Sequence, residues 1–166
     1  MITNIRVNCG IPQHGIEEFL LVDVEDVADL VVTDYVAVIA TTGVPILVES
    51  YKMTSQVTES LQSLDGSAAM KQTVIFNIFD KTKYAELISG LANRRFVAFA
   101  KHRDVGLYKV YGAYCGLELA SADIDSNDAG GYAKISLSTP EGAQGEMSLV
   151  TTRANYDSIK KEIPSN

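Results

Sequence analysis

The chain has 166 residues, of which 46% are apolar and 21% are charged, the balance of a folded globular protein rather than a disordered one. Acids outnumber bases 21 to 14, and the formal net charge of -7 argues against a protein that grips nucleic acid through a basic face. No apolar stretch approaches the roughly 20 residues that span a bilayer, so no membrane partner is expected.

The two cysteines, Cys9 and Cys115, lie far apart and show no CxxC spacing. We expect both to be free thiols, in a chain that folds in a reducing cytoplasm.

The negative charge is concentrated in the first 50 residues, which hold eight acids and one base, whereas residues 51–118 hold nine bases and six acids. Two interpretations stay open: a solvated acidic face, or an acidic end that meets the basic middle of a neighbouring copy. For the second, the candidate lumen or subunit-interface acids are Glu17, Glu18, Asp23, Glu25, Asp26, Asp29 and Asp34. The candidate complementary bases are Arg94, Arg95, Lys101 and Arg103.

The N-terminal third is predicted to be an arm followed by strands. Residues 1–18 are turn-rich and are expected to form an arm or edge segment. Alternation of apolar and polar residues over 17–27 predicts a strand with one solvent-exposed face. The apolar runs 35–40 and 44–50 flank Thr41-Thr42-Gly43, which predicts a hairpin.

The middle of the chain contains the clearest helix pattern. Residues 51–61 and 70–80 are predicted strands on either side of a turn at 65–67, and Asp80 stands at a natural helix N-cap position. After it, Tyr84, Leu87, Ile88 and Leu91 form one apolar stripe, which predicts a helix over about residues 80–93.

The remainder returns to strands. Residues 96–102 and 107–115 predict a hairpin, followed by strands at 116–122 and 132–138, with a kink at Gly116. Residues 141–166 are polar and are expected to be a partner-dependent C-terminal arm, compatible with a short helix around 154–162. The pattern predicts one domain over 1–166 in the β-dominated α+β class, an antiparallel β-sandwich or open barrel with one flanking helix and extended loops or arms.

Residues with potential chemistry do not form a recognisable catalytic or metal-binding pattern. The loop at 123–131 begins like a calcium loop, but Asp128 stands where glycine is needed and Lys134 where a bidentate glutamate is needed. Cys115 and His102 are conceivable as nucleophile and base, yet a cysteine inside a strand is more often a packing residue. We therefore expect no catalytic residue, no metal and no cofactor.

From about residue 51 to 139 the chain resembles small virion structural proteins of tailed bacteriophages, particularly those infecting Bacteroides-type bacteria. The likeness follows the order of strands and helix, and its most specific part is YGAYCGLELASADI (111–124) followed by GGYAKISLS (130–138). The resemblance implies a non-enzymatic subunit that self-assembles into stacked rings of a tail tube or tail-associated channel in the virion.

In such an assembly the partners are other copies of the chain and other tail or connector proteins, with DNA only as non-specific cargo. An acidic lumen would repel DNA phosphates and let the genome slide. A head–tail connector or stopper ring is the alternative within the same class. A small cytoplasmic β-barrel enzyme or ligand-binding domain is the alternative from another class.

Overall fold

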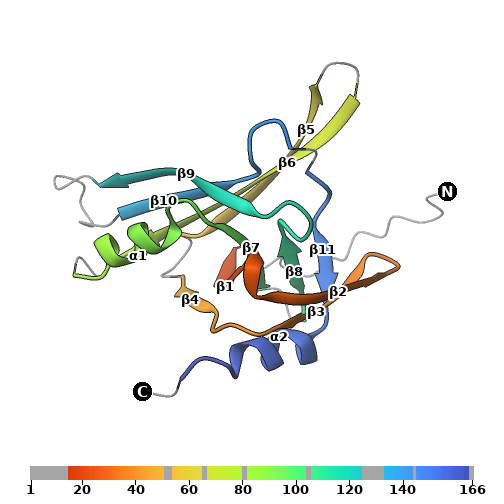
Figure 1. Cartoon of the computed structure of the whole chain (residues 1–166), viewed down its shortest axis with the longest axis horizontal. Coiled ribbons are helices and arrows are strands. Elements are labelled where there is room, and N and C mark those ends of the chain that lie inside the picture. The colour runs from red at the N-terminus through yellow and green to blue at the C-terminus, as the bar shows by residue number, and fades with distance from the viewer. Residues whose placement is uncertain are drawn as a thin grey trace, which may run out of the picture.

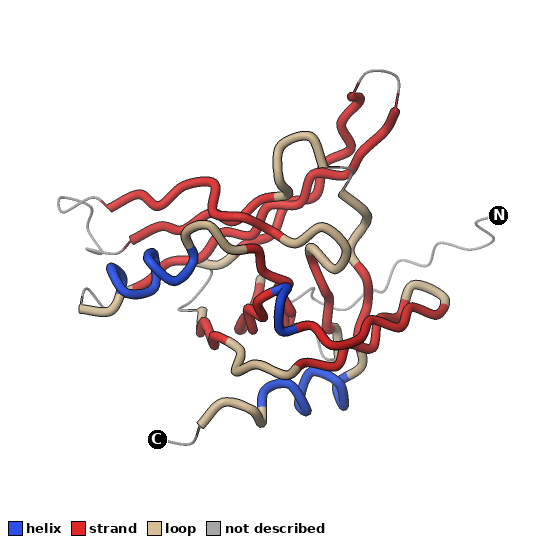
Figure 2. The backbone as a smooth tube through the Cα atoms, viewed as in Figure 1, coloured by secondary structure: helices blue, strands red, loops and turns tan. Residues whose placement is uncertain are grey.

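The computed structural model describes residues 15–50, 54–64, 67–79, 82–103, 106–124, 133–143 and 145–164. Within these ranges the chain is β-dominated, with eleven strands, two α-helices and one 3-10 turn, which confirms the predicted class (Figure 1; Figure 2). The strands are β1 (Ile16–Asp23), β2 (Val27–Thr33), β3 (Val36–Thr41), β4 (Ile46–Glu49), β5 (Gln56–Leu64), β6 (Ser67–Ile78), β7 (Arg95–His102), β8 (Tyr108–Tyr111), β9 (Leu117–Ile124), β10 (Ala133–Ser138) and β11 (Leu149–Thr151). The helices are α1 (Tyr84–Leu91) and α2 (Arg153–Lys160), and the 3-10 turn is η1 (Val24–Asp26).

The strands form one strongly bent sheet in the order β2-β3-β11-β8-β7-β9-β10-β6-β5, and β1 joins it by pairing with both β7 and β4. The pairings are antiparallel except for the short parallel contact between β3 and β11. Among the described strands, β2, β4 and β5 each pair on one side only, so they are the edges of an open sheet.

Strand β1 lies between two hydrophobic cores. Phe19 and Leu21 point into a core closed by β6, β9, β10 and α1, whereas Leu20 and Val22 point into a second core closed by β3, β8, β11 and α2. Both faces of β1 are therefore buried, and the prediction that one face is exposed to solvent was wrong. A strand buried on both faces is apolar at consecutive positions, as Phe19–Val22 are.

The predicted hairpin across Thr41–Gly43 was also wrong. Strand β3 pairs with β2 and β11, and β4 pairs with β1, so these two successive strands separate. The hairpin is instead β2–β3, and Asp34 and Tyr35 form its turn with φ of 49° and 65°. Positive φ at both central residues is the geometry of a type I′ turn, whose twist suits a two-residue hairpin.

Helix α1 is shorter than the predicted 80–93. It begins after Lys83, which makes no side-chain capping bond, and Asp80 lies outside the described residues. Leu91 is fully buried and Leu87 and Ile88 pack against the first core, as the apolar stripe predicts. Asn93 follows with φ of 61°, a left-handed conformation that ends the helix.

Much of the expected C-terminal arm belongs to the body of the fold. Strand β11 is inserted between β3 and β8, and α2 buries Tyr156 and Ile159 in the second core. Thr152 caps α2 by accepting a hydrogen bond of 3.2 Å from the Asn155 amide. Of the expected N-terminal arm, residues 16–18 are the start of β1 and residues 1–14 lie outside the described residues.

Candidate functional site

Two of the candidate acids form salt bridges on the surface of their own chain. The Glu17 carboxylate accepts a hydrogen bond of 2.9 Å from Lys101 Nζ, and Asp23 lies 3.4 Å from Arg94. The Glu17 hydrogen bond raises the pKa of Lys101. Exposed ion pairs of this kind each contribute about 0 to 1 kcal/mol to the free energy of unfolding. Two of the candidate complementary bases, Lys101 and Arg94, thus meet acids within one subunit.

Glu18 lies inside the molecule, beneath α2. Lys160 Nζ donates to both of its carboxylate oxygens at 2.7 Å, and the Tyr156 hydroxyl donates to Oε1 at 3.1 Å. Only 6% of Glu18 is exposed, so this carboxylate cannot line a lumen. Its role is to hold the C-terminal helix against β1.

Replacing Tyr156 with phenylalanine is expected to make stability less sensitive to alkaline pH. Burial, and then the Glu18 carboxylate, raise the pKa of Tyr156 above its usual value of about 10. A raised folded-state pKa gives stability that is complete below about pH 10 and lost as pH rises above it. In urea unfolding the two proteins should respond alike to pH between about pH 8 and pH 10, and above about pH 10 the loss for Tyr156→Phe should be about 1.4 kcal/mol per pH unit less steep than for the wild type. Equal slopes would contradict this.

The other four candidate acids lie on η1 and the β2–β3 hairpin. Glu25, Asp29 and Asp34 are exposed, Asp26 is half-buried, and none of them forms a salt bridge within the described residues. The Asp26 side chain lies against Gly43, where any larger residue would collide with it. Of the seven candidate acids, three form salt bridges within their own chain. The other four lie on one continuous segment, η1 and the β2–β3 hairpin.

The β2–β3 hairpin also exposes apolar side chains. Val31 faces Val38 across the two strands and the two are 53% and 48% exposed, while Tyr35 at the tip is 75% exposed. Val150 of β11 continues this surface, since it pairs with Val36 of β3. We call Val31, Tyr35, Val38 and Val150 the hairpin face. Exposed apolar residues gathered on an edge strand are typical of a protein–protein contact.

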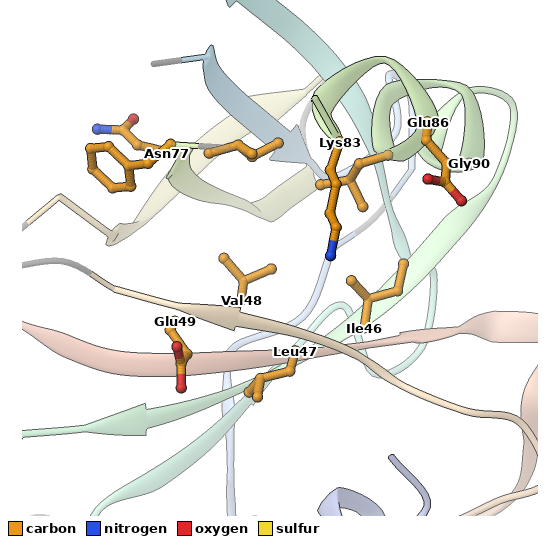
Figure 3. Close-up of a pocket in the computed structure, with 11 residues that line it drawn as sticks. Ile46, Leu47, Val48, Glu49, Asn77, Lys83, Glu86 and Gly90 are labelled. Atoms are coloured by element: carbon orange, nitrogen blue, oxygen red, sulfur yellow. The ribbon is translucent and has the colours of Figure 1, made fainter. Parts of the chain in front are cut away.

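A second feature is a groove of about 640 Å³ between β4 and α1, here called the α1 groove (Figure 3). Its apolar lining comes from Ile46, Val48, Ile78, Phe79 and Leu87. In Figure 3 the Lys83 side chain projects from the start of α1 into this groove, toward β4. Lys83 is exposed and forms no salt bridge within the described residues. The groove thus combines an apolar wall with one cation, Lys83, and two carboxylates, Glu49 and Glu86.

The polar residues His102 and Tyr111 lie in a smaller cleft of about 420 Å³ between β5, β7 and β8. His102 Nε2 lies 3.3 Å from the Tyr111 hydroxyl, and burial raises the pKa of Tyr111. Cys115 is not in a strand as predicted but in the turn after β8, where burial raises the pKa of its thiol, the opposite of what activates a nucleophilic cysteine. The conceived Cys115–His102 pair is therefore not supported.

Glu59 was not singled out from the sequence, although it joins β5 to the loop before β11. Its carboxylate accepts hydrogen bonds from the Ser148 amide at 2.8 Å, from the Ser148 hydroxyl at 2.9 Å and from Gln72 Nε2 at 3.1 Å. Gln72 in turn accepts a hydrogen bond of 2.8 Å from the Gly112 amide. Partners this distant along the chain leave no local sequence pattern. This network fixes the long β5–β6 hairpin on the body of the fold.

The remaining two bases lie at the two ends of β7, Arg95 as its first residue and Arg103 directly after its last. Arg95 is exposed and lines a cleft with Arg94 and Glu118, while the Arg103 backbone amide donates to the Gly15 carbonyl at 3.1 Å. In the described ranges no group of three His, Cys, Asp or Glu residues is placed to hold a metal ion. Most of the loop 123–131 lies outside those ranges. No helix in the described part of the chain is long and apolar enough to cross a membrane.

Comparison with protein-family models, with curated proteins and with solved structures gives no match to this chain. The geometry most relevant to function is the position of the hairpin face and the α1 groove. In Figure 1 the β2–β3 hairpin extends toward one end of the longest axis, and α1 with β4 lies toward the other.

Proposed function

We propose that this chain is a non-enzymatic structural subunit of a tailed-bacteriophage virion, which self-assembles into stacked rings of a tail tube or tail-associated channel. The observation that carries the proposal is the pair of one-sided edge strands, β2 and β4, each beside apolar surface and located toward opposite ends of the molecule. The resemblance of residues 51–139 to phage virion proteins supports the same role. A head–tail connector or stopper ring is the alternative within this class.

Edge strands explain why assembly suits this fold. A one-sided strand presents backbone N–H and C=O groups that pair readily with another chain, and monomeric proteins usually protect such edges with charge, proline or a bulge. Strand β2 has an irregularity between Val27 and Asp29 and carries the charge of Asp29, but its second half exposes the apolar side chains of Val31 and Val32 and has no charge. Closing a ring would cover this edge in every subunit.

Of the seven acids expected at a lumen or interface, we keep four as candidates for that role. Glu25, Asp26, Asp29 and Asp34 are the ones without salt bridges in the described residues, and they lie on η1 and the β2–β3 hairpin. In the proposed ring they either face the channel, where they repel DNA phosphates, or approach a neighbouring subunit.

The proposal predicts that the purified wild-type chain assembles as its concentration rises. Sedimentation velocity from about 1 to about 100 μM should show species larger than a monomer, a range that detects any contact with a dissociation constant up to about 100 μM. Negative-stain microscopy of the concentrated sample should show rings or tubes. A chain that stays monomeric throughout and binds a small apolar molecule in the α1 groove would instead support the ligand-binding alternative.

A further inference from the structure

We infer that the β2–β3 hairpin of one copy docks in the α1 groove of the next copy, where β2 adds to the one-sided edge of β4. This inference rests on the proposed function, because it specifies the contact through which the subunits assemble. The occupant of the groove is thus a second copy of this chain.

The first support is the match between two apolar surfaces. Val31 and Val38 on the hairpin are about half exposed, and the groove offers Ile46, Val48 and Leu87 as a facing apolar wall. Burial of apolar area is the main favourable term in association, at about 25 cal/mol per Å² removed from water.

The second support is charge. Strands β2 and β3 with their turn carry two carboxylates, Asp29 and Asp34, and no Lys or Arg. Lys83 projects into the groove and has no salt-bridge partner in the described residues (Figure 3). The groove is also lined by Glu49 and Glu86, and Figure 3 shows the Glu49 carboxylate directed away from Lys83. The charged lining residues sum to −1, so the groove as a whole does not attract the acidic hairpin, and Lys83 supplies a local cation that orients docking rather than a net attraction.

The third support is the backbone. Strand β4 pairs with β1 and with no other described strand, and β2 pairs only with β3. Adding an extended segment to an exposed sheet edge is a common recognition mode, in which main-chain hydrogen bonds supply affinity and alternate side chains enter pockets. Ile46 and Val48 are the alternate residues of β4 that face the groove.

The position of the two surfaces determines the kind of assembly. Because the hairpin and the groove lie toward opposite ends of one subunit, the contact is head to tail and leaves one hairpin and one groove free in every dimer (Figure 1). Such a contact propagates into a ring or a filament rather than stopping at a two-fold dimer.

The test uses one full-length variant for each surface. Val31→Asp replaces an apolar contact residue with a charge that the apolar wall of the groove would have to desolvate, a cost that an added attraction to Lys83 does not offset. Gly90→Arg fills the groove from α1. A Cβ at position 90 would meet no atom within 4 Å and the position opens onto the groove, so we expect Gly90→Arg to be compatible with the folded monomer. Each variant alone is expected to raise the concentration needed for assembly at least about tenfold. An equimolar mixture should form a discrete heterodimer, because Val31→Asp retains its groove and Gly90→Arg retains its hairpin.

Two matched variants serve as controls. Leu61→Asp changes a residue that is 70% exposed on β5, away from both surfaces, and Gly90→Ala adds only a methyl group to the same helix position. Both are expected to assemble like the wild type, and circular dichroism should show that all four variants are folded.

The outcomes separate this inference from the proposed function. If the wild type assembles and Val31→Asp and Gly90→Arg assemble equally well, the hairpin–groove contact is overturned and the structural role survives. If both variants are monomeric but their mixture gives no heterodimer, the contact is likewise overturned. A wild type that never assembles overturns the proposed function and the contact together.

Discussion

Replacing Asn155 with leucine is expected to lower the free energy of unfolding by about 3 kcal/mol, because it leaves buried backbone groups of β3 without partners. Strand β11 pairs with β3 only at Val36 and Ala37. Further along β3, the Asn155 side chain supplies the hydrogen-bond partners that β11 no longer provides. Its Oδ1 accepts a hydrogen bond of 3.1 Å from the Ile39 backbone amide, and its Nδ2 donates to the Ile39 carbonyl at 2.8 Å. Leucine has the same branched heavy-atom skeleton as asparagine but makes neither bond.

The matched control for Asn155→Leu is Ala154→Leu, since Ala154 is the preceding residue of α2 and is exposed. Urea unfolding of both variants and of the wild type measures how much each substitution lowers the free energy of unfolding. A loss for Asn155→Leu no larger than that for Ala154→Leu would show that the amide does not hold α2 on β3. Since β3 is half of the docking hairpin, Asn155→Leu is also expected to weaken assembly.

Replacing Gly112 with alanine is expected to lower the free energy of unfolding by about 2 to 4 kcal/mol, because it introduces backbone strain and a steric clash. Gly112 has φ of 69°, and a Cβ there would lie 2.7 Å from Leu117 Cγ and 3.1 Å from backbone atoms of Gly116 and Leu117. The residue opens the turn between β8 and β9, in which the Gly116 amide donates to the Gly112 carbonyl at 2.9 Å.

Gly142→Ala is the control that isolates the clash. Gly142 has φ of 78°, and a Cβ there would meet nothing within 4 Å, so its replacement carries only the left-handed backbone cost of about 1 kcal/mol. Thermal or urea unfolding should show Gly112→Ala as the less stable of the two. Equal losses would mean that the contact with Leu117 relaxes without cost.

The parts of the fold that sequence predicted well are those with local signals. The hairpin predicted over 96–102 and 107–115 corresponds to β7 and β8, although β8 ends at Tyr111. This hairpin and the helix around Leu87 and Leu91 were predictable because alternation and a helical stripe are visible in a short window. The predicted β3–β4 hairpin failed because Thr41–Gly43 resembles a turn, while the actual turn uses Asp34 and Tyr35. A non-glycine pair with positive φ is hard to recognise from residue types alone.

The candidate site was predictable in composition but not in geometry. The acidic N-terminal block was visible in the sequence. However, Glu17 pairs with Lys101 and Glu18 pairs with Lys160, at separations along the chain of 84 and 142 residues. Pairings at such distances are set by the sheet topology, so no local pattern reveals which acids are neutralised. The α1 groove also escaped prediction, because its walls come from β4, β6 and α1.

Amide hydrogen exchange of the wild type, compared between dilute and concentrated samples, is the most direct test of head-to-tail assembly. Docking of the hairpin in the groove predicts that exchange slows on assembly in β2, at Val27–Thr33, and in β4, at Ile46–Glu49, because both edges gain backbone partners. Exchange that slows elsewhere while these two strands stay unchanged would contradict it.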